Sequence, residues 1–231
     1  MLAHRVMLAG RRAYAEEVMS DSPVAWWRLD ETSGTTAADS SGNGNHGTYG
    51  SGVTLDQPPL IISGKAIVAT ANSQPAVAGP NIAASTALAV ELWLKLAAPA
   101  ANRAVFGKYA GGQWPVWSLE IASDGKLTVA LYLGNSPTGR VLVTTPASVS
   151  DSQRHQLAVS WDKSGDKKVH LYVDDVQVAE SAAWDNTLWA GSGHTVRLYE
   201  AGSESMTFDE ASVYAHGLSA ARVQAHYNSG A

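Results

Sequence analysis

The segment from residue 88 to residue 96 alternates strictly between two kinds of residue. One set of positions holds aliphatic residues, namely Leu88, Val90, Leu92, Leu94 and Leu96. The other set holds Ala89, Glu91, Trp93 and Lys95. Because successive side chains of a strand point to opposite faces, this period of two predicts a strand with one face in an apolar core.

Other segments repeat this strand character at short intervals. They cover residues 24–29, 103–109, 116–122, 126–133, 140–144, 155–161, 168–173, 176–179, 196–199 and 206–214, and a further strand is expected to start near His46. Turn-forming residues separate several of them, as at 123–125, 162–166 and 174–175. No helical periodicity lies between them, which excludes a parallel α/β sheet. The pattern therefore predicts an all-β fold, a two-sheet antiparallel sandwich.

Helical patterns occur only near the two ends of the chain. Residues 2–19 have a mixed helical spacing, and Ser219 is a suitable N-cap for a short closing helix with Val223, Ala225 and Tyr227. A chain of 231 residues with 45% hydrophobic residues can build one large β-domain. We therefore expect an N-terminal helix or arm over 1–21 and a single sandwich domain over 22–231.

Composition excludes several classes of function. The net charge is −5 and there is no long basic run, which argues against a nucleic-acid partner. The absence of cysteine excludes disulfides, zinc–thiolate sites and a cysteine nucleophile. No stretch has the length of a membrane span, and the N-terminal residues lack the apolar run of a secretory signal. The basic cluster His4, Arg5, Arg11 and Arg12 fits either a solvated helix face or an electrostatic docking peptide.

The loop Asp39-Ser40-Ser41-Gly42-Asn43-Gly44-Asn45 is rich in oxygen donors and glycines. Calcium prefers six to eight oxygens from carboxylates, amides, backbone carbonyls and water. Asp39, Asn43 and Asn45 offer such oxygens within one tight loop. The alternative is an Asx-type turn without metal, in which these side chains only cap loop amides.

A second candidate site combines aromatic and polar residues. Sugars present C–H patches that stack on rings and hydroxyls that require hydrogen-bond partners. The candidate ligand-binding residues lie around two loops, and they are Tyr109, Gln113, Trp114, Trp117, Asn135 and Arg140. Trp184 and Trp189 mark another loop. The alternative is that these rings cap the core, and Trp26, Trp93 and Trp161 are expected in the core because they lie in strands.

The carboxylates do not form the pair that glycoside hydrolysis requires. Glu91 and Glu120 stand alone on their strands, and the adjacent residues Asp209 and Glu210 are expected to point to opposite faces of a sheet. No zinc-protease or serine-hydrolase motif is present. We therefore predict that the protein is not an enzyme.

Four blocks in order make the chain resemble the laminin-G-like branch of the concanavalin A-like lectin/glucanase superfamily. They are residues 22–31 with 39–45, residues 89–94, residues 155–162 with 171–174, and residues 208–214 with 217–220. The resemblance covers about residues 21–228. It implies a jelly-roll sandwich that binds carbohydrate or protein at one face or rim, often with one structural calcium. It makes Asp39 and Asp209 the best calcium ligands, followed by Asn43 and Asn45.

One turn departs from the family pattern. The family hairpin usually has Asp-Gly where this chain has Asp174-Asp175. Because aspartate adopts the left-handed conformation less readily than glycine, we expect a different type of turn there.

The N-terminal block also resembles domains of virion proteins from actinobacterial phages. This resemblance implies a particle protein, which needs no secretory signal because lysis releases it. We therefore expect a non-enzymatic module that binds a glycan or a cell-envelope surface on a phage particle, in several copies, docked through its N-terminal arm. The alternatives are a structural capsid or tail decoration protein without glycan binding, and a secreted bacterial adhesion module.

Overall fold

The computed structural model confirms the predicted all-β sandwich. It describes residues 14–62, 64–70, 77–79, 81, 86–97, 101–110, 113–132, 138–200 and 205–231. The predicted N-terminal helix is described only from residue 14, and residues 14–20 are helical. The basic cluster at residues 4–12 lies outside the described ranges. No helix among the described residues is both long and apolar enough to cross a membrane.

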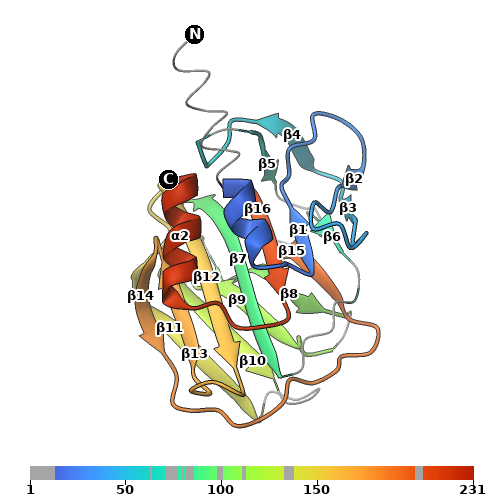
Figure 1. The fold of residues 1–231 in the computed structure, drawn as a ribbon. Coiled ribbons are helices and arrows are strands. Elements are labelled where there is room, and N and C mark those ends of the chain that lie inside the picture. The colour runs from blue at the N-terminus through green and yellow to red at the C-terminus, as the bar shows by residue number, and fades with distance from the viewer. Residues whose placement is uncertain are drawn as a thin grey trace.

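Two antiparallel sheets form the jelly roll (Figure 1). The first sheet has the order β14 (Val176–Glu180), β13 (Val169–Val173), β12 (Arg154–Asp162), β7 (Ala87–Leu96), β16 (Met206–Tyr214), β5 (Ala66–Ala69) and β4 (Val53–Gln57), and β1 (Ala25–Trp27) also pairs with β16. The second has the order β11 (Arg140–Ser148), β10 (Lys126–Tyr132), β9 (Trp117–Ile121), β8 (Arg103–Tyr109), β15 (Thr195–Glu200), β6 (Val77–Ala78), β3 (Gly47–Tyr49) and β2 (Thr36–Ala37).

The main core lies between the two sheets. The aliphatic positions of β7 contribute to it together with Phe106 and Trp117, whose rings meet edge to face at 5.2 Å between centroids. The period-two pattern of residues 88–96 therefore marks the inward face of β7, as predicted. Full burial of each large apolar side chain contributes about 1.5–3 kcal/mol to folding.

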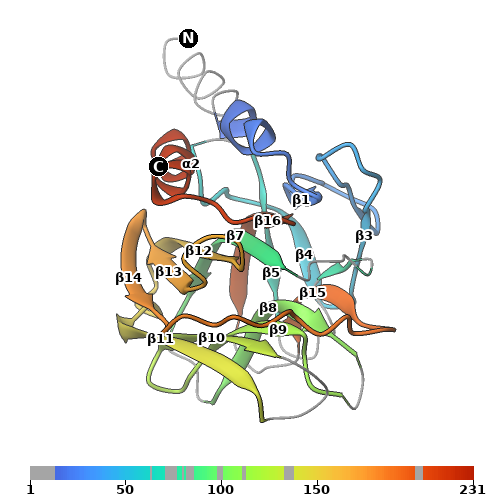
Figure 2. The same cartoon turned by 60° about the horizontal axis from the view of Figure 1, so that its bottom comes forward.

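The other face of the first sheet is also covered. Helical residues 14–20 and α2 (Ala220–Gly230) lie side by side over it (Figures 1 and 2). Trp93 and Trp26 are buried there with Tyr14 and Val18, and Tyr227 of α2 stacks on Trp93 at 5.6 Å. This cover explains why Ala89, Glu91 and Trp93 of β7 are buried as well, whereas Lys95 at the end of the strand is exposed.

The predicted N-cap of α2 is confirmed. The Ser219 side chain accepts the backbone N–H of Arg222, which satisfies one of the otherwise unpaired donors of the first turn. Trp26, Trp93 and Trp161 are all buried, as predicted, although only Trp161 lies in the core between the sheets.

The strand pattern predicted most strands of the two sheets and missed four of them. The expected ranges 103–109 and 206–214 coincide with β8 and β16. The sequence prediction did not include β2, β4, β5 or β6. β2 and β6 are only two residues long, and the burial of β4 alternates only between intermediate and exposed, so neither length nor pattern distinguishes these three strands from loops. β5 is a four-residue apolar segment without a clear alternation.

The expectation that Asp209 and Glu210 point to opposite faces is wrong. The pairing of β16 with β7 shifts register between Asp209 and Ser212, and Glu210 has a φ of 53°. Asp209 accepts the backbone N–H of Leu60 at 3.0 Å, and Glu210 accepts the indole N–H of Trp26 at 2.8 Å. Both partners belong to the cluster outside the first sheet. The bulge therefore places two consecutive side chains on one face.

The turn at Asp174-Asp175 also differs from expectation. Both residues have positive φ, 51° and 68°, so the two aspartates adopt the left-handed conformation after all. They link β13 to β14 as a two-residue hairpin, which favours positive φ at both central positions. The contacts of the Asp174 side chain offset the cost of its left-handed backbone. This side chain accepts a hydrogen bond from the backbone N–H of Gln156 at 2.9 Å and contacts His155.

Candidate functional site

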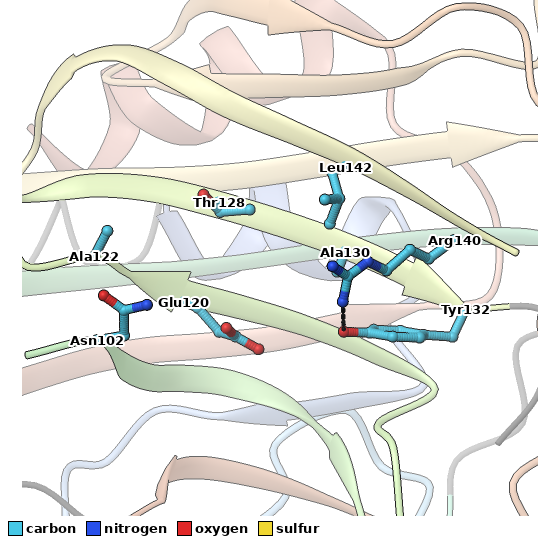
Figure 3. Close-up of a pocket in the computed structure, with 8 residues that line it drawn as sticks. All are labelled: Asn102, Glu120, Ala122, Thr128, Ala130, Tyr132, Arg140 and Leu142. Carbon is cyan, nitrogen blue, oxygen red and sulfur yellow. Dashed lines mark hydrogen bonds between the residues drawn. The ribbon is translucent and has the colours of Figure 1, made fainter. Parts of the chain in front are cut away.

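The outer face of the second sheet carries a hollow of about 150 Å³. Within the described chain, no helix covers this face, which lies opposite the two terminal helices (Figure 2). The lining residues come from β9, β10 and β11 and from the positions just before β8 and just after β9. They are Asn102, Glu120, Ala122, Thr128, Ala130, Tyr132, Arg140 and Leu142 (Figure 3).

Strand alternation brings these side chains to one face. On β10, Leu127, Val129 and Leu131 point into the core, so Thr128, Ala130 and Tyr132 point outward. The cross-strand register then sets their neighbours, because Tyr132 pairs with Arg140, Ala130 with Leu142, and Thr128 with Glu120. The small side chain of Ala130 leaves space between larger neighbours and forms the floor of the hollow (Figure 3).

One end of the hollow is aromatic and cationic. Trp114 is 41% exposed and stacks on Tyr132, with 6.1 Å between ring centroids and 30° between planes. The guanidinium of Arg140 lies 5.8 Å from the centroid of the Tyr132 ring, and its Nη1 donates to the Tyr132 hydroxyl at 3.4 Å. Tyr132 itself is only 3% exposed, so the accessible groups at this end are the Trp114 ring and the Arg140 guanidinium, which both pack on Tyr132.

A buried histidine supports Trp114 from behind. The Nε2 atom of His194 lies 3.0 Å from the Trp114 carbonyl oxygen. His194 itself is fully buried and packs edge to face against Trp189 at 4.6 Å. Trp189 is in turn anchored, because its backbone N–H donates to the Tyr132 carbonyl at 3.1 Å. The two loops that carry Trp114 and Trp189 therefore brace each other.

The opposite end of the hollow is acidic. Glu120 is partly buried, and its Oε1 accepts the hydroxyl hydrogen of Ser118 at 2.8 Å. Glu120 is the one carboxylate among the described residues that line the hollow. Asn102 and Thr128 lie beside it and add neutral donors and acceptors (Figure 3).

The structure brings together only some of the residues expected to bind a ligand. Trp114 and Arg140 meet through Tyr132, and Gln113 is exposed next to Trp114. Trp117 is 2% exposed and belongs to the core, and Tyr109 is buried as well, so neither ring faces the hollow. Asn135 lies outside the described residues.

Among the lining residues, only Arg140 was predicted to bind a ligand. Tyr132, Glu120 and Thr128 lie in strands, whereas the predicted residues were placed around loops. The sequence did carry a signal for these three residues, because each occupies a strand position that alternates with core residues such as Leu119 and Leu131. Strand parity shows that such a residue leaves the core, but it does not show whether another element covers it.

The loop from Asp39 to Asn45 is closed by hydrogen bonds. The Oδ1 atom of Asp39 accepts the backbone N–H groups of Trp26 and Ser41, and Oδ2 accepts from the Ser41 hydroxyl and the Asn45 N–H, all at 2.8–3.0 Å. The amides of Asn43 and Asn45 donate to the Val24 carbonyl. Burial opposes the charge of Asp39, but these donors outweigh it and lower the pKa of its carboxyl group.

This arrangement fits the Asx-type alternative, and its contacts require no cation. Asp209, the other expected ligand, lies on β16 beneath Leu60 and outside the loop. Among the described residues, no group of three His, Cys, Asp or Glu side chains is placed to hold a metal ion. Calcium binding by Asp39, Asn43, Asn45 and Asp209 therefore stays a prediction.

Comparison with known proteins agrees with this fold. The model of a family described as the concanavalin A-like lectin/glucanases superfamily, Laminin_G_3, matches residues 69–224. The chain belongs to this family. The match covers the strands that form the hollow, and the resemblance inferred from the sequence blocks is confirmed at the level of family and fold. No curated protein matches the chain at the sequence level.

Several solved structures share the fold of this laminin-G-like chain. The binding domain of Paraclostridial Mosquitocidal Protein 1 superposes with a TM-score of 0.72 at 13% identity, covering 91% of this chain and 53% of that one. The botulinum neurotoxin serotype D ligand binding domain, in complex with N-acetylneuraminic acid, gives 0.69 at 13% identity, with 93% and 52% covered. The botulinum neurotoxin type G receptor binding domain gives 0.69 at 11% identity, with 90% and 51% covered. The chain thus spans about half the length of these domains.

Proposed function

We propose that the protein is a non-enzymatic carbohydrate-binding module whose site is the hollow on the outer face of the second sheet. The observation that carries this proposal is the stack of exposed Trp114 on Tyr132 at the edge of the hollow. An exposed tryptophan held in place by neighbouring loops offers a flat apolar surface at little entropic cost. The C–H face of a sugar ring fits such a surface.

The polar residues of the hollow suit the remaining groups of a sugar. Glu120 can accept hydrogen bonds from sugar hydroxyls, and Asn102 and Thr128 can both donate and accept them. The small side chain of Ala130 leaves room for the sugar ring. We expect a shallow site of this kind to bind a sugar weakly by itself. Several copies on one particle would raise the effective affinity by avidity.

The absence of a paired carboxylate in the hollow supports a binding role. Glycoside hydrolysis uses two carboxyl groups about 5–10 Å apart, and Glu120 is the only acid among the described lining residues. The structural relatives named above are binding domains, and one of them was crystallised with a sugar.

The biological setting we propose is a phage particle, on which the module would aid attachment to the bacterial envelope. The hollow and the terminal helices lie on opposite faces of the sandwich (Figure 2). A segment that docks the N-terminal end to a particle would therefore leave the hollow facing outward. A secreted adhesion module would use the same face.

The test is a glycan array that includes bacterial envelope polysaccharides, probed with the wild type, Trp114→Ala and Val176→Ala. Val176 is 59% exposed on β14 of the other sheet, so its variant is the matched control for loss of exposed apolar surface. We expect binding that Trp114→Ala abolishes and Val176→Ala retains. If the folded wild-type protein binds no glycan, the proposal is wrong and the protein is instead a structural decoration protein.

A further inference from the structure

The guanidinium of Arg140 has no acidic partner within the described chain. Its contacts there are the ring and the hydroxyl of Tyr132. Arg222 shows the contrast, because it pairs with Glu17 at 2.6 Å and with Asp21 at 2.7 Å. Arg140 is exposed and lines the hollow, so most of its five N–H donors remain available to a ligand.

The backbone positions of Arg140 and Glu120 lie at opposite ends of the hollow. Arg140 pairs with Tyr132, whereas Glu120 pairs with Thr128 four residues earlier on β10, which is about 13 Å along the strand. β11 and β9 flank β10, so Arg140 and Glu120 also lie two strand spacings apart, about 10 Å. The two side chains approach the floor at Ala130 from opposite ends (Figure 3). The hollow therefore carries one cationic and one anionic side chain, whose backbone positions lie at its opposite ends.

We propose that this site selects an acidic glycan, with an anionic group of the sugar on Arg140 and its hydroxyls directed to Glu120. This inference rests on the proposed carbohydrate-binding function and adds the class of ligand. The planar fork of arginine matches the oxygens of a carboxylate, sulfate or phosphate with two parallel hydrogen bonds. The Tyr132 ring holds the guanidinium in place, which reduces the entropy that binding would cost.

The overall charge of the protein cannot account for a preference for acidic sugars. With a net charge of −5, the chain does not attract polyanions through its general field. A preference for acidic sugars must therefore come from a specific cation in the site. The preference should depend on Arg140 itself. It should weaken as salt screens the attraction between the Arg140 guanidinium and the anionic group of the sugar.

The experiment compares matched ligands that differ only in the anionic group. Isothermal titration would use oligogalacturonate against its methyl ester, a sulfated oligosaccharide against its desulfated form, and a sugar phosphate polymer against its dephosphorylated form. The proteins are the wild type, Arg140→Gln, Arg140→Lys, Trp114→Ala, and Lys167→Gln. Lys167 lies outside the hollow and pairs with Asp185, so its variant makes the same change of net charge elsewhere.

We expect the wild type and Lys167→Gln to bind at least one acidic ligand about tenfold more tightly than its neutral match. Arg140→Gln should remove this preference, so that it binds the acidic ligand no more tightly than the neutral match. Arg140→Lys should keep only part of the preference because lysine lacks the fork. Trp114→Ala should lose both ligands. The ligand pair that shows the preference identifies whether the site selects a carboxylate, a sulfate or a phosphate.

Two results would overturn the inference and leave the proposed function intact. One is equal binding of acidic and neutral ligands by the wild type, and the other is an acidic preference that survives in Arg140→Gln. Failure of the wild type to bind any glycan would instead overturn the proposed function. Thermal unfolding of each variant confirms that it is folded before its binding is compared.

Discussion

The Nδ1 atom of His226 lies 2.7 Å from the Oε2 atom of Glu91, although the two residues are 135 positions apart. His226 belongs to α2 and Glu91 to the central strand β7, and both side chains are buried. The other ring nitrogen of His226 lies 2.9 Å from Asp21, which follows the helical residues 14–20. One imidazole ring thus joins both terminal segments to the first sheet.

The stability of the protein should fall as the pH rises above neutrality. Burial of the His226 ring opposes its charge, but Glu91 and Asp21 outweigh burial and raise the pKa of His226 above its usual value near 6.5. Tyr214 donates to Glu91, and Arg222 on α2 also contacts Asp21. A raised pKa in the folded state means that this stabilisation is complete below about pH 6.5 and is lost as the pH rises through the folded value.

Thermal unfolding between pH 5.5 and pH 9.5 would measure this effect. His226→Gln should lose about 3 kcal/mol at pH 6, because it leaves the buried Glu91 carboxylate without its cation. It should also flatten the pH dependence. His170→Gln is the control, since His170 pairs with Asp166 at the surface. An unchanged pH profile in His226→Gln would contradict the assigned role of the ring.

Asp39→Ala should destabilise the protein by about 2–3 kcal/mol, because it leaves backbone donors of Trp26, Ser41 and Asn45 without their charged acceptor. The pKa of Asp39 is lowered, so its contribution is present above the ordinary carboxyl range near 3.9 and is lost as the pH falls through the folded value. Urea unfolding at pH 7 and pH 3 measures both effects. A loss of equal size at the two pH values would show that the charge of Asp39 is irrelevant.

Calcium should stabilise the protein if the prediction for residues 39–45 holds. A ligand at a hundredfold excess over its Kd adds about 2.7 kcal/mol to the free energy of unfolding. The check is the melting temperature with calcium, with magnesium and with EDTA, for the wild type and for Asn43→Ala. If calcium and EDTA give the same melting temperature, the prediction is wrong and the hydrogen-bonded turn is the complete account of this loop.

The two aspartates of the β13–β14 hairpin should respond to glycine in opposite ways. Asp175→Gly should raise the free energy of unfolding by about 0.5 kcal/mol, because it relieves a left-handed residue at some cost in unfolded-chain entropy. Asp174→Gly should lower it by about 2 kcal/mol, because the Asp174 carboxylate accepts from Gln156 and contacts His155. Chemical unfolding of both variants measures the difference. Equal effects of the two substitutions would mean that the side chain of Asp174 contributes nothing.

Local patterns predicted the fold more completely than they predicted the site. The alternation of residues 88–96 and the recurring turns depend only on neighbouring residues, so they were visible in the sequence. Trp114 and Arg140 were identified by residue type in glycine-containing loops. Tyr132, which joins them, was missed because it looks like any other strand aromatic until its neighbours are known.

The position of Glu210 illustrates the same limit. A strict strand rule placed it opposite Asp209, but a bulge with a φ of 53° turned it to the same face. The bulge depends on how β16 pairs with β7 and on the indole of Trp26, which lies 184 residues away in the chain. No local pattern carries that information.

The sequence by itself determined that this chain forms antiparallel strands in a laminin-G-like sandwich, because side-chain alternation, turn residues and an N-cap act over a few residues. Only the tertiary structure decided which sheet face stays open. The terminal helices cover the first sheet, while cross-strand register aligns Arg140, Tyr132, Ala130 and Glu120 on the second. The strand register and the packing of the terminal helices depend on contacts between segments that are distant in the chain. These contacts determine where the candidate site lies.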